Sequence, residues 1–105
     1  GAYPLSLART TGAGSAPAPE VRNGMLLIRL PAGRPGPLFV AGEFSGWSLL
    51  PMEERGGDWR IAVPVTTGVT RFSFVDQGGE WFVPEGYPGR VSDDMGGHVV
   101  VVVLP

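Results

Sequence analysis

Short hydrophobic segments alternate with turn-forming segments from Val21 to the end of the chain. The hydrophobic segments read MLLIRL, PLFVAGEF, WRIAVPV, TRFSFVD, EWFVP and HVVVVVL, and stretches rich in glycine, proline, aspartate and serine separate them. Runs of this length and spacing are typical of strands in a β-sandwich, and no long helical period survives between the turns. The pattern therefore predicts a small all-β fold.

Alternation within two segments assigns an inner and an outer face. In residues 59–63 the odd positions are apolar, and in residues 72–74 the two phenylalanines point to the same side. The predicted core residues are Trp59, Ile61, Val63, Phe72 and Phe74. Ser73 lies between the two phenylalanines and is predicted to face outward.

The closing segment HVVVVVLP is apolar at nearly every position, so alternation assigns no face to it. It predicts either a central or closing strand covered on both sides, or a strand partly exposed to another surface.

Residues 1–20 differ from the rest of the chain in composition. The stretch TTGAGSAPAPE is rich in small residues and proline, which is typical of a tether. We interpret residues 1–20 as a tail or linker and residues 21–105 as one domain. The alternation of Leu5 and Leu7 with smaller residues leaves an extra edge strand as the alternative, and the tether suggests a fused or partner domain upstream.

Charge and composition narrow the possible partners. The chain has 105 residues, a net charge of −2, 17 glycines, 11 prolines and no cysteine. Its basic residues are all arginines and are scattered singly, which argues against nucleic acid and anionic membranes as partners. No stretch approaches membrane-spanning length, so a soluble protein is expected; the compartment stays open, with the cytoplasm favoured. Arginine without lysine is typical of a GC-rich, hence bacterial, genome.

Three motifs occur in a fixed order along the domain. The first is Gly-x-Phe-x-x-Trp at Gly42–Trp47, the second runs from a Leu-Pro-Met segment at Leu50 to a Trp-Arg strand ending at Arg60, and the third runs from Phe72 through a turn to Trp81. Over residues 24–104 this ordered set resembles carbohydrate-binding module family 48. That family includes the glycogen-binding domain of the AMP-activated protein kinase β subunit and the early-set domains of isoamylases and branching enzymes.

The resemblance implies an immunoglobulin-like (early-set) β-sandwich of about seven short strands. It also implies a module without cofactors that holds α-1,4-linked glucan, such as glycogen or starch, on an open face. By motif position, the two stacking tryptophans of the kinase domain fall on Trp47 and Trp81. A sugar ring packs its C–H groups on an indole face, and the indole N–H can bond a hydroxyl.

Other family site positions have changed. The sugar-contacting lysine of the family aligns with Ser73, its threonine and asparagine align with Gly97 and Val99, and Met95 retains an apolar member. The predicted carbohydrate-binding residues are therefore Trp47, Trp81, Ser73, Met95, Gly97 and Val99. The stacking half of the site is kept and the hydrogen-bonding half is largely lost, which predicts weak binding, altered specificity or none.

Each candidate residue also has a structural interpretation. Trp47 could instead cover the edge of the sandwich, whereas Trp81 is the better platform residue because Phe82 can fill the core. His98, the single histidine, is expected to be exposed or locally hydrogen-bonded. Asp93 and Asp94 are expected to bond nearby backbone in a turn, so no metal site is predicted.

No arrangement of residues indicates catalysis, because glycosidase carboxylate pairs, nucleophile elbows and phosphate-binding loops are all missing from the sequence. Two functions remain open. One is a non-catalytic α-glucan-binding module, and the other is a structural or protein-interaction domain that has lost sugar binding. The second would use the valine-rich strand, and the choice between a monomer and a homodimer stays open.

Overall fold

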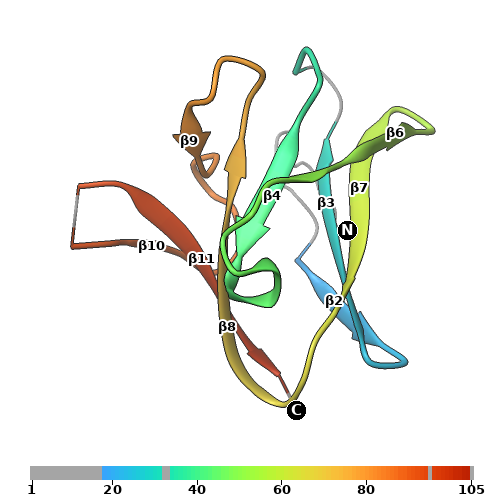
Figure 1. Ribbon diagram of the computed structural model, residues 1–105, viewed down its shortest axis with the longest axis vertical. Coiled ribbons are helices and arrows are strands. Elements are labelled where there is room, and N and C mark those ends of the chain that lie inside the picture. Colours follow the sequence, from blue (N-terminus) through green and yellow to red (C-terminus); the bar gives the residue numbers. More distant parts are fainter. Residues whose placement is uncertain (1–17, 32–33, 95, 105) are drawn as a thin grey trace, which may run out of the picture.

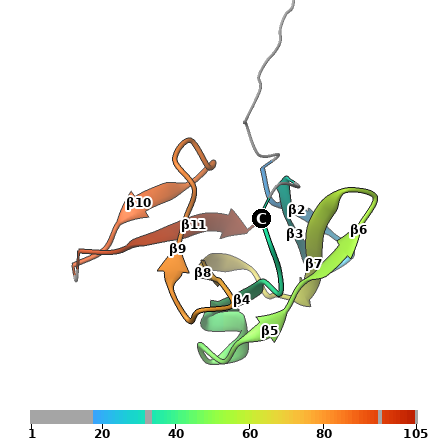
Figure 2. The same cartoon turned by 90° about the horizontal axis from the view of Figure 1, so that it is seen from above.

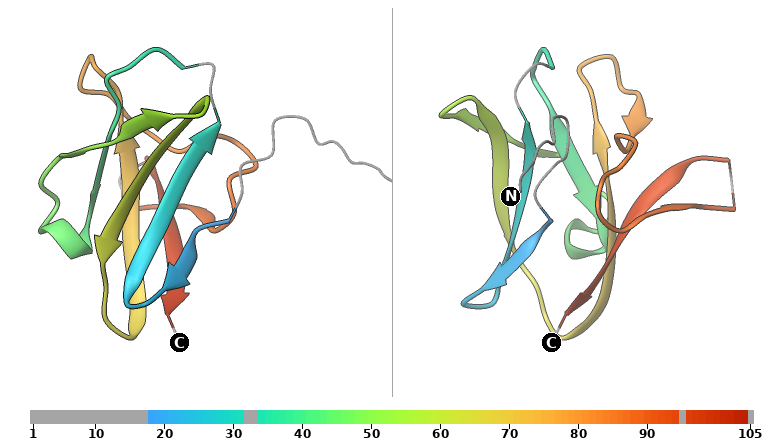
Figure 3. Two further views of the ribbon diagram at one scale, coloured as in Figure 1. Left: turned by 90° about the vertical axis from the view of Figure 1, so that its right-hand side faces the viewer. Right: turned by 180° about the vertical axis from the view of Figure 1, so that it is seen from behind.

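Two antiparallel sheets pack face to face, which confirms the predicted immunoglobulin-like β-sandwich (Figure 1; Figure 3, right). The computed structural model describes residues 18–31, 34–94 and 96–104. The four-stranded sheet has the order β2-β3-β7-β6, and the six-stranded sheet has the order β10-β11-β8-β4-β5 with β9 also paired to β8.

The first sheet contains β2 (Glu20–Arg22), β3 (Met25–Pro31), β6 (Glu53–Arg55) and β7 (Asp58–Pro64). The second contains β4 (Phe39–Gly42), β5 (Leu50–Pro51), β8 (Gly68–Val75), β9 (Trp81–Phe82), β10 (Arg90–Ser92) and β11 (His98–Leu104). A single 3-10 turn, η2 (Glu43–Ser45), follows β4 within the described residues. The hairpin of β10 and β11 extends away from the rest of its sheet (Figure 1 and Figure 2).

The core lies between the sheets and is made by the inward positions of β3, β4, β7, β8 and β11. Alternating burial along β3 and the 0% exposure of Phe72 and Phe74 follow from the two-residue period of a strand. The predicted core residues Trp59, Val63, Phe72 and Phe74 are buried, and Ile61 packs against them from the rim.

All six hydrophobic segments of the sequence contain strands, but four further strands lie in stretches that the sequence assigns to connections or to the linker. These are β2, β5, β6 and β10, each two or three residues long. All four are edge strands of a sheet, and none of them has a buried position, so they carry little hydrophobic signal. β2 begins at Glu20, inside the predicted linker, and the proposed strand at residues 3–8 lies outside the described residues.

The valine-rich β11 is neither an edge strand nor covered on both sides. It pairs with β10 and with β8, and its inward residues Val100 and Leu104 are 0% and 7% exposed. Its outward residue Val103 is 76% exposed and lies opposite Val69, which is 50% exposed. The alternative of a partly exposed strand therefore holds.

Tyr87 is buried in the core beside Phe74 and donates its hydroxyl to the carbonyl oxygen of Arg29 at 3.4 Å. Burial raises the pKa of Tyr87 above its usual value of 10.0, and the charge of Arg29 opposes this rise in part. The folded state thus keeps a proton that the unfolded state releases. Stability from this group is present below pH 10 and is lost as the pH rises further.

We therefore expect the free energy of unfolding to fall as the pH rises above about 10, and Tyr87→Phe to remove most of this dependence. No lysine or cysteine side chain titrates in this pH range, because the chain contains neither residue. Urea denaturation of both proteins between about pH 8 and pH 11 measures the effect. An unchanged slope in Tyr87→Phe would assign the effect to other groups.

Candidate functional site

The sequence EFSGW forms a compact turn between β4 and β5. Glu43–Ser45 make the 3-10 turn η2, and the hydroxyl of Ser45 donates to the carbonyl oxygen of Ser48 at 2.8 Å. Gly46 has a φ of 61° and Trp47 a φ of 65°, so both adopt the left-handed backbone conformation. A bulky residue there costs about 1–3 kcal/mol, which surrounding contacts must offset.

Two contacts fix this turn to the sheet. The backbone N–H of Trp47 donates to the carbonyl oxygen of Gly42 at 2.8 Å. The carboxylate of Glu43 accepts the backbone N–H of Arg71 at 3.1 Å and the guanidinium of Arg71 at 3.0 Å. Because Arg71 belongs to β8, Glu43 ties the turn that carries Trp47 to the centre of the six-stranded sheet.

Trp81 reaches the same side of the molecule through the hairpin of β8 and β9. The carboxylate of Asp76 accepts the N–H groups of Gly78 and Glu80 at 2.9 and 3.0 Å, which closes the turn. Trp81 then pairs with Val75, and Phe82 pairs with Phe74. The ring of Phe82 packs against Phe74 with 5.8 Å between centroids, so Phe82 joins the core as predicted and Trp81 is 50% exposed.

Trp47 and Trp81 form a pair of exposed aromatic rings. Their ring centroids lie 6.3 Å apart with an angle of 44° between the planes, and Trp47 is 42% exposed. The predicted edge-cover role of Trp47 therefore holds only in part, because nearly half of its surface remains open. Two residues separated by 34 positions thus present one continuous aromatic surface.

This pair lines a groove that also contains Ser73, Gly97 and Val99, with a volume of about 570 Å³. Five of the six predicted site residues therefore meet in one place, which we call the Trp groove. The sixth, Met95, lies outside the described residues. The Trp groove is formed by β8, β9, the β10–β11 hairpin and the turn after β4.

Ser73 was predicted to face solvent, but this prediction is wrong, because the residue is only 2% exposed. It lies where the pairing partner of β8 changes from β11, whose pairing ends at Phe72, to β9, whose pairing begins at Phe74. Its hydroxyl is 3.2 Å from the carbonyl oxygen of Phe82 and 3.4 Å from that of His98, and it can donate to either. The one hydroxyl proton of Ser73 is thus used by a backbone acceptor on one of the two diverging strands, within the fold.

Asp93, Asp94 and Gly97, between β10 and β11, also line the groove. The carboxylate of Asp93 accepts the N–H of Gly97 at 2.8 Å, while the N–H of Asp93 donates to the carbonyl oxygen of Gly97 at 3.0 Å. The predicted turn role of Asp93 is therefore confirmed. Val99 pairs with Val91, and both line the groove with apolar surface.

Sequence reasoning missed several polar residues of the groove. Arg71, Ser92 and Asp94 line it together with Asp93 and His98. Arg71 was detectable in principle, because it lies two residues before Ser73 and therefore on the same face of the strand. Ser92 could not be found in this way, since β10 has no recognisable strand pattern, and the sequence assigned Asp94 only a role in the turn.

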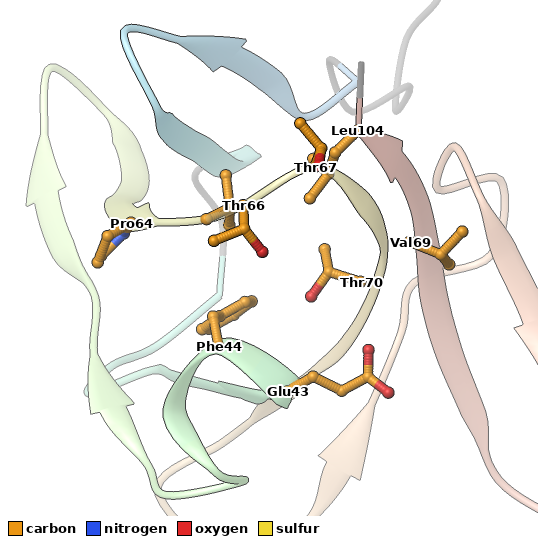
Figure 4. A pocket seen from close by; sticks show the side chains of 9 residues that line it. Glu43, Phe44, Pro64, Thr66, Thr67, Val69, Thr70 and Leu104 are labelled. Carbon is orange, nitrogen blue, oxygen red and sulfur yellow. The ribbon is translucent and has the colours of Figure 1, made fainter.

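A second hollow, of about 350 Å³, is lined in part by Glu43 and Phe44 of the η2 turn (Figure 4). Phe44, Thr66, Thr67 and Thr70 line it, with Leu104 at one side. Phe44 packs against Phe72 with 6.0 Å between ring centroids and so belongs to the rim of the core. This hollow contains none of the residues predicted from the sequence to bind a ligand.

Two further observations bear on the chemistry of the described residues. No group of three or more histidine, aspartate or glutamate side chains among them is arranged to hold a metal ion. None of the helical segments in these ranges is long and apolar enough to cross a membrane.

In comparisons with known proteins, neither a family model nor a curated protein matches the chain.

Proposed function

We propose that the protein is a non-catalytic module that binds α-1,4-linked glucan of the glycogen or starch type in the Trp groove. The observation that carries this proposal is the pair of half-exposed tryptophans, 6.3 Å apart, in a groove with three further residues at family site positions. Exposed indoles that present rigid faces lose little conformational freedom when a sugar stacks on them.

The tilt of the two rings supports a curved ligand. The planes of Trp47 and Trp81 differ by 44°, so one rigid flat surface cannot stack fully on both. An α-1,4-linked glucan turns from one sugar to the next and can present successive rings at an angle, whereas a β-1,4-linked chain is extended and flat. We therefore expect the Trp groove to prefer the α-linked chain.

The strain at Trp47 supports a binding role as well. A left-handed backbone for a tryptophan is unfavourable, and glycine or asparagine would adopt it more readily. Residues held in sparsely populated backbone conformations cluster at functional sites, among them ligand-binding segments. Burial of Trp47 in the core does not explain this conformation, because its side chain remains 42% exposed.

The acidic residues of the groove favour binding over hydrolysis. A glycosidase holds two carboxyl groups on opposite sides of the scissile bond, about 5–10 Å apart. The carboxylates that line the Trp groove, Asp93 and Asp94, are neighbours on one wall, and Asp93 is bonded to the backbone of its own turn.

Isothermal titration calorimetry with maltoheptaose and β-cyclodextrin tests this function. We expect saturable binding by the wild type, at least about tenfold weaker binding by Trp47→Ala and by Trp81→Ala, and no binding of a β-1,4-linked cello-oligosaccharide. Trp59→Phe is the matched control, because Trp59 is buried on the inner face of β7. Absence of binding by folded wild type at millimolar sugar would refute the proposal.

A protein-contact role is the second candidate, and the exposed valine pair Val69 and Val103 favours it. Exposed apolar side chains on adjacent strands can be covered by a partner molecule. Size-exclusion chromatography with light scattering distinguishes the candidates. A monomer that binds glucan would exclude a self-association role for these valines.

A further inference from the structure

Stacking alone leaves a sugar free to slide and rotate, so a specific site also needs hydrogen-bonding groups. Three of the residues at family site positions cannot supply them through their side chains. The Ser73 hydroxyl is used within the fold, Gly97 has no side chain, and Val99 is apolar. Beyond the indole N–H groups, hydrogen bonds to sugar hydroxyls therefore fall to the other polar residues of the Trp groove.

Arg71 is the one arginine among the described residues that line this groove. It lies on β8 opposite Val101, on the outer face that also carries Ser73. Its side chain is 51% exposed, so its charged end reaches solvent at the rim of the groove. Stacking residues and a strong donor thus share one surface.

Glu43 holds this guanidinium in place. One carboxylate oxygen contacts Nη1 at 3.0 Å, and the other accepts the backbone N–H of the same arginine at 3.1 Å. Glu43 also begins the turn that carries Trp47, so the orientation of the guanidinium and the position of the indole depend on the same residue. A guanidinium has five N–H donors, and the contact through Nη1 leaves donors on Nη2 and Nε for a ligand.

We propose that Arg71 recognises adjacent hydroxyl groups of the bound sugar and makes the Trp groove selective for glucans whose 2- and 3-hydroxyls are free. This inference rests on the proposed glucan-binding function. The planar guanidinium presents parallel N–H donors that match two neighbouring oxygen acceptors, whereas an ammonium group lacks this fork. Glu43 acts as a positioning residue.

The test compares β-cyclodextrin with heptakis(2,3-di-O-methyl)-β-cyclodextrin, in which methyl groups screen the two oxygens. Calorimetry of the full chain is expected to show that the wild type prefers the unmethylated sugar by about tenfold. Arg71→Ala should bind β-cyclodextrin about tenfold more weakly and should lose this preference. Arg71→Lys should recover only part of it. Arg55→Ala is the matched control, because Arg55 is also exposed and ion-paired but lies on β6 of the other sheet.

The outcomes separate this inference from the proposed function. If the wild type binds glucan through Trp47 and Trp81 but Arg71→Ala keeps the preference for free hydroxyls, the role of Arg71 is refuted and the function stands. An equal loss of affinity for both sugars would also refute it, since Arg71 would then act on the shape of the groove. If the wild type binds neither sugar, the function and this inference both fail. Circular dichroism and thermal unfolding of each variant establish that it is folded.

Discussion

Replacement of Gly42 by alanine is expected to lower the free energy of unfolding by about 1–3 kcal/mol or more, and to weaken glucan binding at least tenfold. The reason is lack of space, because the extended backbone of Gly42, with φ of −164°, is accessible to any residue. A Cβ at this position would lie 2.6 Å from the carbonyl oxygen of Arg71 and 2.6 Å from the Cβ of Phe72. Both obstacles belong to the central strand and cannot move aside cheaply.

The same crowding would reach the Trp groove. The carbonyl oxygen of Gly42 accepts the backbone N–H of Trp47, so a displacement of residue 42 moves the turn on which the indole is mounted. The measurements are urea denaturation for stability and calorimetry with β-cyclodextrin for binding. Gly78→Ala is the matched control, since its Cβ would meet only Asp76 Oδ1 at 3.4 Å. Wild-type stability in Gly42→Ala would show that β4 and β8 can separate without cost.

Phe74→Ala is expected to destabilise the fold by about 3–5 kcal/mol, because it removes a fully buried ring and leaves a cavity between the sheets. Phe74 contacts three aromatic neighbours, with ring centroids of Phe72, Phe82 and Tyr87 at 5.6, 5.8 and 5.3 Å. Small domains have free energies of unfolding of about 5–15 kcal/mol, so this one substitution is expected to remove a large share of the total.

The midpoint of urea denaturation measures this loss, with the slope of the transition as a check that the unfolded state is unchanged. Val103→Ala, on the outer face of β11, should change stability by no more than about 0.5 kcal/mol, because Val103 is 76% exposed. A large effect at Val103 would instead indicate that a second molecule covers that face in solution.

Much of the fold was predictable because the strongest signal in the sequence, hydrophobic alternation, reports on the same strands that build the core. Trp59 and Val63, and the pair Phe72 and Phe74, are buried as their spacing requires. The short strands β5, β6 and β10 were not predictable in this way. They exist because longer neighbours, β4, β7 and β11, offer unpaired backbone groups, and that pairing leaves little trace in side-chain pattern.

The sequence predicted which residues form the candidate site, but it did not predict their spacing or what each side chain contacts. Motif order identified Trp47 and Trp81, although nothing in the linear sequence specifies a separation of 6.3 Å between their rings. Ser73 was expected on the surface because it alternates with buried phenylalanines. It is buried instead, because β9 and β11 diverge beside it and its hydroxyl meets carbonyl oxygens from both.

Local periodicity and turn chemistry are enough to specify the sandwich class, the inner faces of its main strands and the position of two tryptophans beside turns. The ion pair between Glu43 and Arg71, which are 28 residues apart, arises instead from tertiary packing, and it lies at the base of the turn that carries Trp47. Contacts of this kind depend on the register between β4 and β8. That register is set by the packing of both sheets together, which no short stretch of sequence contains.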